Sequence, residues 1–380
     1  MKRIGLIYPD KDPTSPKNWS GTPHGLATGL ASLGFEVVPI PCILPLWHRG
    51  PIAVRSRLRK LGRTTFHRSA WDTWGRSRSI SISIARAGKV DGIIAMGTDL
   101  YDLRFATQGT KTPIATYDDG TFALFLRYPD SDITASALPD EEVSRCIALQ
   151  RLACRHADVA CVSTSWAKRS VVDDFNVPDH RVLVVGMGHT PRLLGRSTRN
   201  FEAPRFLFVG VDWKRKNGTA VLEAFARVRA QIPNATLAVV GKHPQLEQPG
   251  VEGYGFLARE NPVDQSLLDE LFASATVFVL PSLFDPSPIA YLEAASAGLP
   301  VIATTCGGAG ELLGDACLTV DPYDHDALYN AMMNLSDGIL ARSMGKLALL
   351  RSAKSRWVDV SERIAGRLTE WAQEKELAVS

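Results

Sequence analysis

Short apolar runs alternate with stretches of helical spacing along the chain, and this alternation occurs twice. The apolar runs of the first half are RIGLIY, EVVPI, DGIIAM, PIATY and VACVST, and those of the second half are RFLFVGV, ATLAVVG, VFVLPS and PVIATT. Parallel strands buried on both faces lack polar alternation, so such runs with helices between them predict a parallel sheet. We therefore expect an α/β chain with two doubly wound, Rossmann-like domains.

The domain bounds follow from the breaks in this pattern. Residues 188–204, GHTPRLLGRSTRNFEAP, have no periodicity and predict a linker between domains at 1–190 and 204–350. Residues 351–380 carry apolar side chains at helical spacing, which predicts a last helix that packs back on the first domain. This stripe consists of Trp357, Val360, Ile364, Leu368 and Trp371.

The amino-acid composition indicates the number of domains and the general class of protein, but it does not indicate a binding partner. The 380 residues, 45% of them apolar, fit roughly two domains, and a net charge of +3 favours no partner class. The six cysteines form no CxxC pair, which favours a reducing compartment and argues against a zinc site. No stretch reaches the roughly 18 uninterrupted apolar residues of a membrane span, so we expect a cytoplasmic protein.

One segment has a strong local bias. Residues 47–89 contain 11 Lys or Arg and one acid, Asp72, with Trp47, Phe66, Trp71 and Trp74 between them. A solvated helical surface explains this pattern, and so does a site for an anionic acceptor or a membrane surface. No recognisable nucleic-acid module accompanies it, so we expect no nucleic-acid partner.

Ligands of doubly wound sheets bind at the carboxyl ends of the strands, and pockets concentrate at domain interfaces. We therefore expect the motifs of the two domains to face one central cleft. The loop of VGVDWKRKNG lies between a strand and a helix and carries Lys214, Arg215 and Lys216. These cations and the helix N-terminus suit a diphosphate, while a solvated basic turn is the plainer explanation.

Two glycine turns accompany this loop. TTCGGAGELL places Gly307 and Gly308 between a strand and a helix, and NWSGTPHGLA places Gly21 and Gly25 before a small-residue helix. Glycine lets the backbone approach a ligand closely, although an ordinary tight turn uses it as well.

Two carboxylates lie eight residues apart in LFDPSPIAYLEAASAG. Glu293 falls in a predicted helix and can accept hydrogen bonds from the vicinal hydroxyls of a ribose, unless it only caps the helix or pairs with a lysine. Asp285 lies in the preceding loop, where it would face the sugar end of the same ligand. The Pro-rich loop directs the backbone N–H groups of Ile289 and Ala290 toward the same place.

These residues resemble a known family. The chain is similar over nearly its whole length, and most closely from Phe206 to Asp315, to the retaining GT-B glycosyltransferases of the family 4 type. The family's E-x7-E motif resembles DPSPIAYLE, its GR-x4-KG loop resembles GVDWKRKNG, and its GG-x2-E turn resembles GGAGELL with Glu311. The segment that begins YGFLAREN resembles the part of the family that holds the nucleobase.

The resemblance implies an N-terminal acceptor-binding domain and a C-terminal nucleotide-sugar-binding domain. It implies that Lys216 contacts the donor diphosphate, Glu293 the ribose and Asp285 the transferred sugar. Val211 stands where the family has an arginine, so Arg215 is the expected substitute. The donor site implied in this way comprises Gly21, Gly210, Arg215, Lys216, Gly255, Phe256, Leu257, Asp285, Ser287, Ile289, Ala290 and Glu293.

Two departures from the family concern catalysis. Asp285 is one methylene shorter than the family's glutamate. Asp118 and Asp119 stand where a first-domain histidine is common, and His24 in the glycine loop is the weaker candidate for that role. The expected catalytic groups are thus Asp285, Lys216, Arg215, Asp118 and Asp119.

The implied reaction moves a hexosyl unit from a nucleoside diphosphate sugar to a glycan or lipid-linked acceptor, with retained anomeric configuration. Catalysis would come from orientation and from stabilisation of the departing diphosphate, without a metal ion or other cofactor. Two alternatives stay open. One is a GT-B sugar-nucleotide epimerase that uses Asp118, Asp119 and Glu311, and the other is a non-catalytic protein that closes on a sugar nucleotide.

Overall fold

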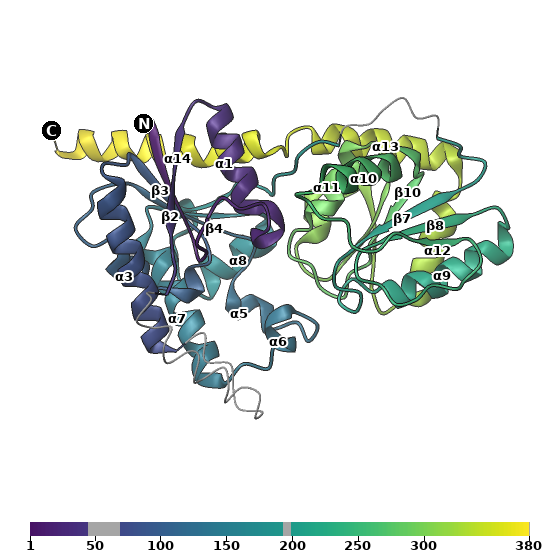
Figure 1. The fold of residues 1–380 in the computed structure, drawn as a ribbon, viewed down its shortest axis with the longest axis horizontal. Coiled ribbons are helices and arrows are strands. Elements are labelled where there is room, and N and C mark those ends of the chain that lie inside the picture. Colours follow the sequence, from purple (N-terminus) through teal and green to yellow (C-terminus); the bar gives the residue numbers. More distant parts are fainter. Residues whose placement is uncertain (45–68, 193–198, 380) are drawn as a thin grey trace. The chain divides into compact units, whose positions relative to one another are not determined.

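The computed structural model describes residues 1–44, 69–192 and 199–379 (Figure 1). The chain forms two compact units, Met1–Gly186 with Trp357–Ser380 and Met187–Arg356. Each unit has a six-stranded parallel sheet with helices on both faces. The predicted α/β fold with two doubly wound domains is confirmed.

The first sheet has the strand order β2-β1-β3-β4-β5-β6. Its strands are β1 Arg3–Tyr8, β2 Glu36–Pro41, β3 Gly92–Ala95, β4 Ile114–Asp118, β5 Val159–Val162 and β6 Val182–Val184. The helices of this unit are α1 Thr22–Ser32, α3 Ala70–Ala87, α4 Leu103–Ala106, α5 Phe122–Phe125, α6 Asp132–Ala135, α7 Asp140–His156, α8 Ser165–Asp173 and α14 Trp357–Val379. The strand order reverses between β1 and β3, which is where ligands of such sheets bind.

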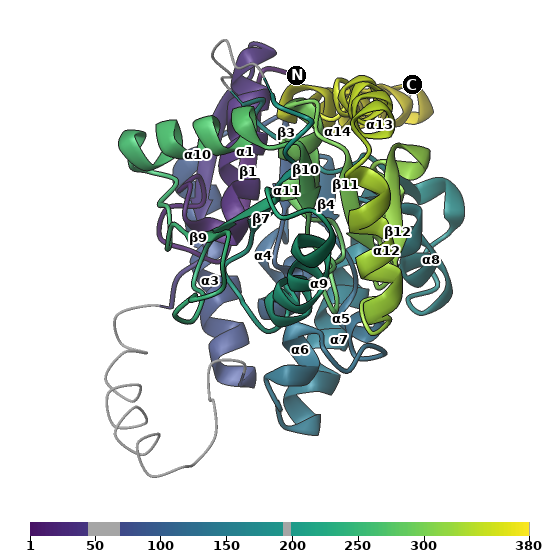
Figure 2. The ribbon, with the colours of Figure 1, turned by 90° about the vertical axis from the view of Figure 1, so that its right-hand side faces the viewer.

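The second sheet has the order β12-β11-β10-β7-β8-β9, so its reversal lies between β7 and β10. The strands are β7 Arg205–Val209, β8 Thr236–Val240, β9 Val251–Gly253, β10 Val277–Val279, β11 Val301–Thr304 and β12 Cys317–Val320. The helices are α9 Gly218–Gln231, α10 Pro262–Ser274, α11 Ile289–Ser296, α12 His325–Leu335 and α13 Gly338–Ser352. Helices α9 and α12 pack side by side on one face of this sheet (Figure 2).

Local sequence explains where several helices begin. Ser69, Thr164 and Asn261 precede α3, α8 and α10, and each side chain accepts a hydrogen bond from a backbone N–H of the first turn. Such caps satisfy donors that have no partner within the helix. The strands carry the core, because β3 and β11 are buried at every residue.

The last helix belongs to the first unit. Helix α13 ends at Ser352 and α14 begins at Trp357, so the final helix starts later than residue 351. Its apolar residues Trp357, Val360, Ile364 and Leu368 are buried. Helix α14 lies along α1, where the Ser361 hydroxyl donates to the Leu26 carbonyl over 3.1 Å (Figure 1).

The prediction that Gly25 precedes the small-residue helix and lets a ligand approach is wrong. Gly25 lies in the first turns of α1, which begins at Thr22. A Cβ atom at this position would collide with the Trp357 indole. Gly25 therefore provides room for α14. Gly21, the residue before α1, has φ of 87°, a conformation that favours glycine.

Candidate donor-binding site

The loop after β7 presents two cations at the reversal point of the second sheet. Asp212 shapes this loop, since its carboxylate accepts the Arg215 backbone N–H at 3.1 Å and its carbonyl accepts the Lys216 N–H at 2.9 Å. An aspartate that bonds backbone groups a few residues ahead fixes a turn. Asn217 follows with φ of 61° and begins α9. Lys216 and Arg215 are thus held at the carboxyl end of the strand.

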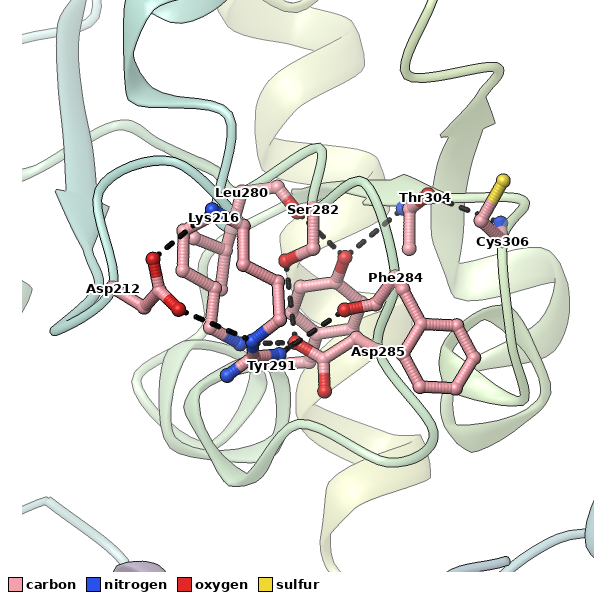
Figure 3. A network of polar contacts seen from close by, with 10 residues as sticks. Asp212, Lys216, Leu280, Ser282, Phe284, Asp285, Tyr291, Thr304 and Cys306 are labelled. Carbon is pink, nitrogen blue, oxygen red and sulfur yellow. Dashed lines mark hydrogen bonds and ion pairs between the residues drawn. The ribbon is translucent and has the colours of Figure 1, made fainter. Parts of the chain in front are cut away.

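The loop after β10 brings Asp285 to the same cations. Figure 3 shows Lys216 and Ser282 converging on its carboxylate. Lys216 Nζ forms an ion pair with Oδ2, Arg215 Nη1 lies 3.8 Å from that oxygen, and the Ser282 hydroxyl donates to it over 3.2 Å. The structure therefore brings Asp285, Lys216 and Arg215 together as one cluster with a net charge of one positive unit.

Backbone contacts lock this cluster in place. The Arg215 guanidinium donates to the Phe284 carbonyl over 3.1 Å, and the Asp285 N–H donates to the Cys306 carbonyl over 3.1 Å. Gly307 has φ of 104°, and a Cβ there would collide with the Asp285 carbonyl. Gly307 thus lets the turn after β11 close on the Asp285 loop. Glu311 follows in a short 3-10 helix and is exposed.

Helix α11 begins beside Asp285, and its N-terminus has no side-chain cap. Ile289 and Ala290 form its first turn, whose backbone N–H groups suit an anionic ligand. Ser287 is buried, and its hydroxyl has no hydrogen-bond partner among the described residues. Tyr291 fixes the helix to the sheet, because its hydroxyl donates to the Leu280 carbonyl over 2.7 Å and accepts the Thr304 N–H at 2.9 Å.

Glu293, in the second turn of α11, is 3% exposed and pairs with two arginines. Its Oε1 accepts from Arg192 Nη2 at 2.8 Å and from Arg259 Nη1 at 3.4 Å. Burial acts to raise the pKa of Glu293, but the positive charges of Arg192 and Arg259 outweigh it and the pKa falls below its ordinary value. Glu293 is therefore a fixed carboxylate, and its partners are arginines and not the lysine that the alternative explanation named.

The predicted nucleobase loop follows β9. The Gly255 carbonyl accepts the Gly241 N–H at 2.8 Å, and the Gly255 N–H donates to His243 Nε2 over 3.1 Å. Phe256 is 55% exposed and its ring centroid lies 6.0 Å from Lys242 Nζ. Leu257 is partly buried. Arg259, two residues on, ties this loop to Glu293 on α11.

The other predicted residues lie in the first unit. Burial of the Asp118 carboxyl group and the neighbouring charges of Asp99 and Asp119 raise its pKa well above the ordinary value. The Thr98 hydroxyl lies 3.5 Å from Asp118 Oδ2. His24 lies in the first turn of α1 and not in the glycine loop, where it was expected; it is exposed, and its Nδ1 bonds the Thr14 carbonyl of the preceding loop at 2.9 Å.

Sequence patterns did not indicate Arg192 or Ser282. Arg192 lies in the connecting segment that lacks periodicity, and Ser282 shares its loop with the more conspicuous Asp285. Within the described parts of the chain, no three His, Cys, Asp or Glu side chains are grouped to hold a metal ion. No helix among the described residues is long and apolar enough to cross a membrane.

Several known proteins match this chain in part. Residues 203–337 match the family model described as glycosyl transferases group 1. A sucrose-phosphate synthase of Spinacia oleracea is 26% identical over 160 residues, which are 36% of this chain and 15% of that protein. A GDP-mannose-dependent alpha-(1-6)-phosphatidylinositol monomannoside mannosyltransferase of Mycolicibacterium smegmatis is 32% identical over 148 residues, 34% of this chain and 38% of that protein.

The matches with these relatives thus span well under half of their length.

One solved structure has a similar fold over the whole chain, although its sequence identity with this chain is low. The sucrose-phosphate synthase of Thermosynechococcus elongatus superimposes with a TM-score of 0.70 at 16% identity and covers 100% of both chains.

Proposed function

We propose that this chain, which has the GT-B fold and whose residues 203–337 match the group 1 glycosyltransferases, transfers a hexosyl unit from a nucleoside diphosphate sugar to an acceptor hydroxyl with retained anomeric configuration. The observation that carries the proposal is the cluster of Lys216, Arg215 and Asp285 at the reversal point of the second sheet. Two fixed cations beside an uncapped helix N-terminus suit the diphosphate of such a donor.

The donor would lie along the loops at this edge of the sheet. Lys216, Arg215 and the first N–H groups of α11 would bind the diphosphate, and the unpartnered Ser287 hydroxyl would bind one of its oxygens. Glu293 would accept hydrogen bonds from the ribose, and residues 255–257 would contact the base. Asp285 would face the transferred sugar when Lys216 and Arg215, its cationic partners, also bind the diphosphate.

In the reaction, the bond between the anomeric carbon and the diphosphate oxygen breaks while the acceptor oxygen bonds that carbon on the same face. The departing diphosphate gains negative charge, which Lys216 and Arg215 stabilise without a metal ion. The acceptor hydroxyl proton passes to the leaving phosphate oxygen. Asp118, whose raised pKa keeps its proton to a higher pH than an ordinary aspartate, and Asp119 are proposed to contact the acceptor.

The test is a thermal-shift screen of UDP-, GDP-, ADP- and dTDP-sugars on the full chain, followed by transfer assays with the donor that binds. A ligand at about 100 times its Kd stabilises a native state by roughly 2.7 kcal/mol, which the screen detects. We expect one nucleotide class to raise the Tm, and the Lys216→Ala variant to show a smaller shift. If no sugar nucleotide raises the Tm, the proposal is wrong.

The same assay separates the two alternatives. If the chain were an epimerase, it would isomerise the sugar of the donor during incubation without acceptor. A donor that binds but is left unchanged with every lipid-linked and glycan acceptor tried would indicate a non-catalytic binding protein.

The acceptor is proposed to be a glycan or a lipid-linked sugar, and helix α3 is proposed to contact an anionic membrane surface on the cytoplasmic side. Trp71 and Trp74 are 47% and 39% exposed and stack at 5.3 Å between ring centroids. Arg78 lies 6.0 Å from the Trp74 ring, and Ile82 is exposed one helical turn further on. Trp beside basic residues suits the interface of anionic lipids. The part of the 47–89 segment before Ser69 lies outside the described residues.

Vesicle sedimentation tests this contact. We expect the full chain to bind phosphatidylglycerol vesicles, and a Trp71→Ser, Trp74→Ser variant to bind them roughly tenfold more weakly, because less apolar surface enters the interface. Ile339→Ser on α13 is the matched control, since Ile339 is also highly exposed but lies in the other unit. Equal binding of all three proteins, or no preference for anionic lipid, would remove this part of the proposal.

A further inference from the structure

Arg192 reaches from the start of the second unit into the contact between α10 and α11. Its Nη1 donates to Gln265 Oε1 over 3.0 Å and lies 3.4 Å from Asp269 Oδ1, while Nη2 donates to Glu293 Oε1 over 2.8 Å. The guanidinium also lies over the Phe272 ring, 5.1 Å from its centroid. With only 7% of the side chain exposed, this arginine is held from two helices at once.

A buried ion pair is a poor way to anchor a connecting segment. Removing a carboxylate and a guanidinium from water costs several kcal/mol each, and apolar residues often fill such sites with equal or better stability. The chain already has an anchor of a simpler kind nearby. Arg199 contacts α10 and the end of α11, and within the described parts of the chain it donates to backbone carbonyls alone, those of Phe272 at 3.2 Å, Gly298 at 3.5 Å and Ala297. What distinguishes Arg192 is that it binds a carboxylate.

The two arginines leave one oxygen of Glu293 available. Both Arg192 and Arg259 donate to Oε1, so neither arginine occupies Oε2. Because a carboxylate is planar, fixing Oε1 from the α10 side also fixes the direction of Oε2. The charges of Arg192, Arg259, Asp269 and Glu293 sum to zero, so the group is stable without an added ion.

We infer that Arg192 is a positioning residue for donor binding, which holds Oε1 of Glu293 so that Oε2 is directed to the vicinal hydroxyls of the pentose. This inference rests on the proposed function. Arg192 itself does not contact the donor in this scheme. Its effect should therefore appear only through the hydroxyl groups that Glu293 binds, and not through the phosphates or the base.

The experiment compares a nucleoside diphosphate with its 2′,3′-dideoxy form. Calorimetry first identifies which of UDP, GDP and ADP the wild-type chain binds, and then measures the Kd of both forms for each variant. Hydrogen bonds to charged groups predict that wild type binds the dideoxy form about 10 to 100 times more weakly. For Arg192→Gln we expect this ratio to fall to about threefold or less, because Glu293 is no longer oriented.

Two further variants make the outcome decisive. Arg199→Gln removes a connecting-segment arginine of equal size and should keep the wild-type ratio even if its Tm falls. Arg192→Lys keeps the charge without the planar fork and should give an intermediate ratio, and it serves in place of Arg192→Gln if that variant does not fold. A wild-type ratio in the Arg192 variants would overturn the inference while leaving the proposed function intact. Wild-type protein that binds only dTDP, which lacks the 2′-hydroxyl, would overturn the inference alone, and wild-type protein that binds no nucleoside diphosphate would overturn both.

Discussion

Replacing Lys216 with Ala is expected to lower the rate of sugar transfer by roughly 10²- to 10³-fold, the loss seen when one preorganised group that stabilises transition-state charge is removed. Lys216 is the residue whose ammonium group pairs with Asp285 at the reversal point of the second sheet. Without it, the departing diphosphate loses a cation and meets the Asp285 carboxylate, which then keeps only Arg215 at 3.8 Å and the Ser282 hydroxyl. The loss should appear mainly in kcat, measured at saturating donor.

Two comparisons test this explanation. Lys214 lies in the same loop but is exposed, so Lys214→Ala should leave kcat within about twofold. Adding Asp285→Asn to Lys216→Ala removes the carboxylate that repels the phosphate and should raise donor affinity above that of the single variant. Normal turnover by Lys216→Ala would show that the diphosphate is not bound at this cluster.

Replacing Glu293 with Gln is expected to destabilise the protein by about 3–5 kcal/mol at neutral pH, because it removes the nearer of the two carboxylates that pair with the buried Arg192 guanidinium and leaves Asp269 at 3.4 Å. The side chains of Arg192 and Glu293 are 7% and 5% exposed, so water cannot replace the lost partner. In a domain of this size the Tm should fall on the order of 10 °C, measured by calorimetry. Glu252→Gln is the control, since the Glu252–Arg205 pair is exposed and should contribute less than about 1 kcal/mol.

The pH dependence of this difference has a definite sign. The pKa of Glu293 in the folded protein is lower than its ordinary value of 4.5, so the folded state favours the ionised form. This stabilisation is present in full above pH 4.5 and is lost as the pH falls through the folded-state pKa. The Tm difference between wild type and Glu293→Gln should therefore shrink as the solution is acidified. A difference that grows toward acid pH would contradict the assignment of Glu293 as a carboxylate.

The fold was predictable because its main strands are continuous apolar runs. Three strands were missed, β6, β9 and β12, since VLV and VEG are only three residues long and CLTV is buried at its two ends alone. The Lys216 loop and the Asp285 loop were both expected at the carboxyl ends of strands in the second domain. The structure adds that these strands, β7 and β10, are neighbours at the reversal point.

The partners of Glu293 could not be predicted in this way. Arg192 belongs to a segment without periodicity, and nothing in its neighbours indicates that it enters a contact between α10 and α11. Gly25 is a similar case, because its environment is set by Trp357, more than 300 residues away in the sequence. Such contacts depend on where distant segments pack, which local pattern does not encode.

The membership of α14 in the first unit has a consequence for the order of assembly. The second unit is one continuous stretch, Met187–Arg356, whereas the first is interrupted by it and needs Trp357 onward to cover α1. During synthesis, every residue of the second unit is therefore translated before the first unit has all the residues that it needs to fold. Until then, the glycine-lined surface of α1 lacks the indole that fills it, and a chain that stalls before α14 would carry a complete second unit and an incomplete first one.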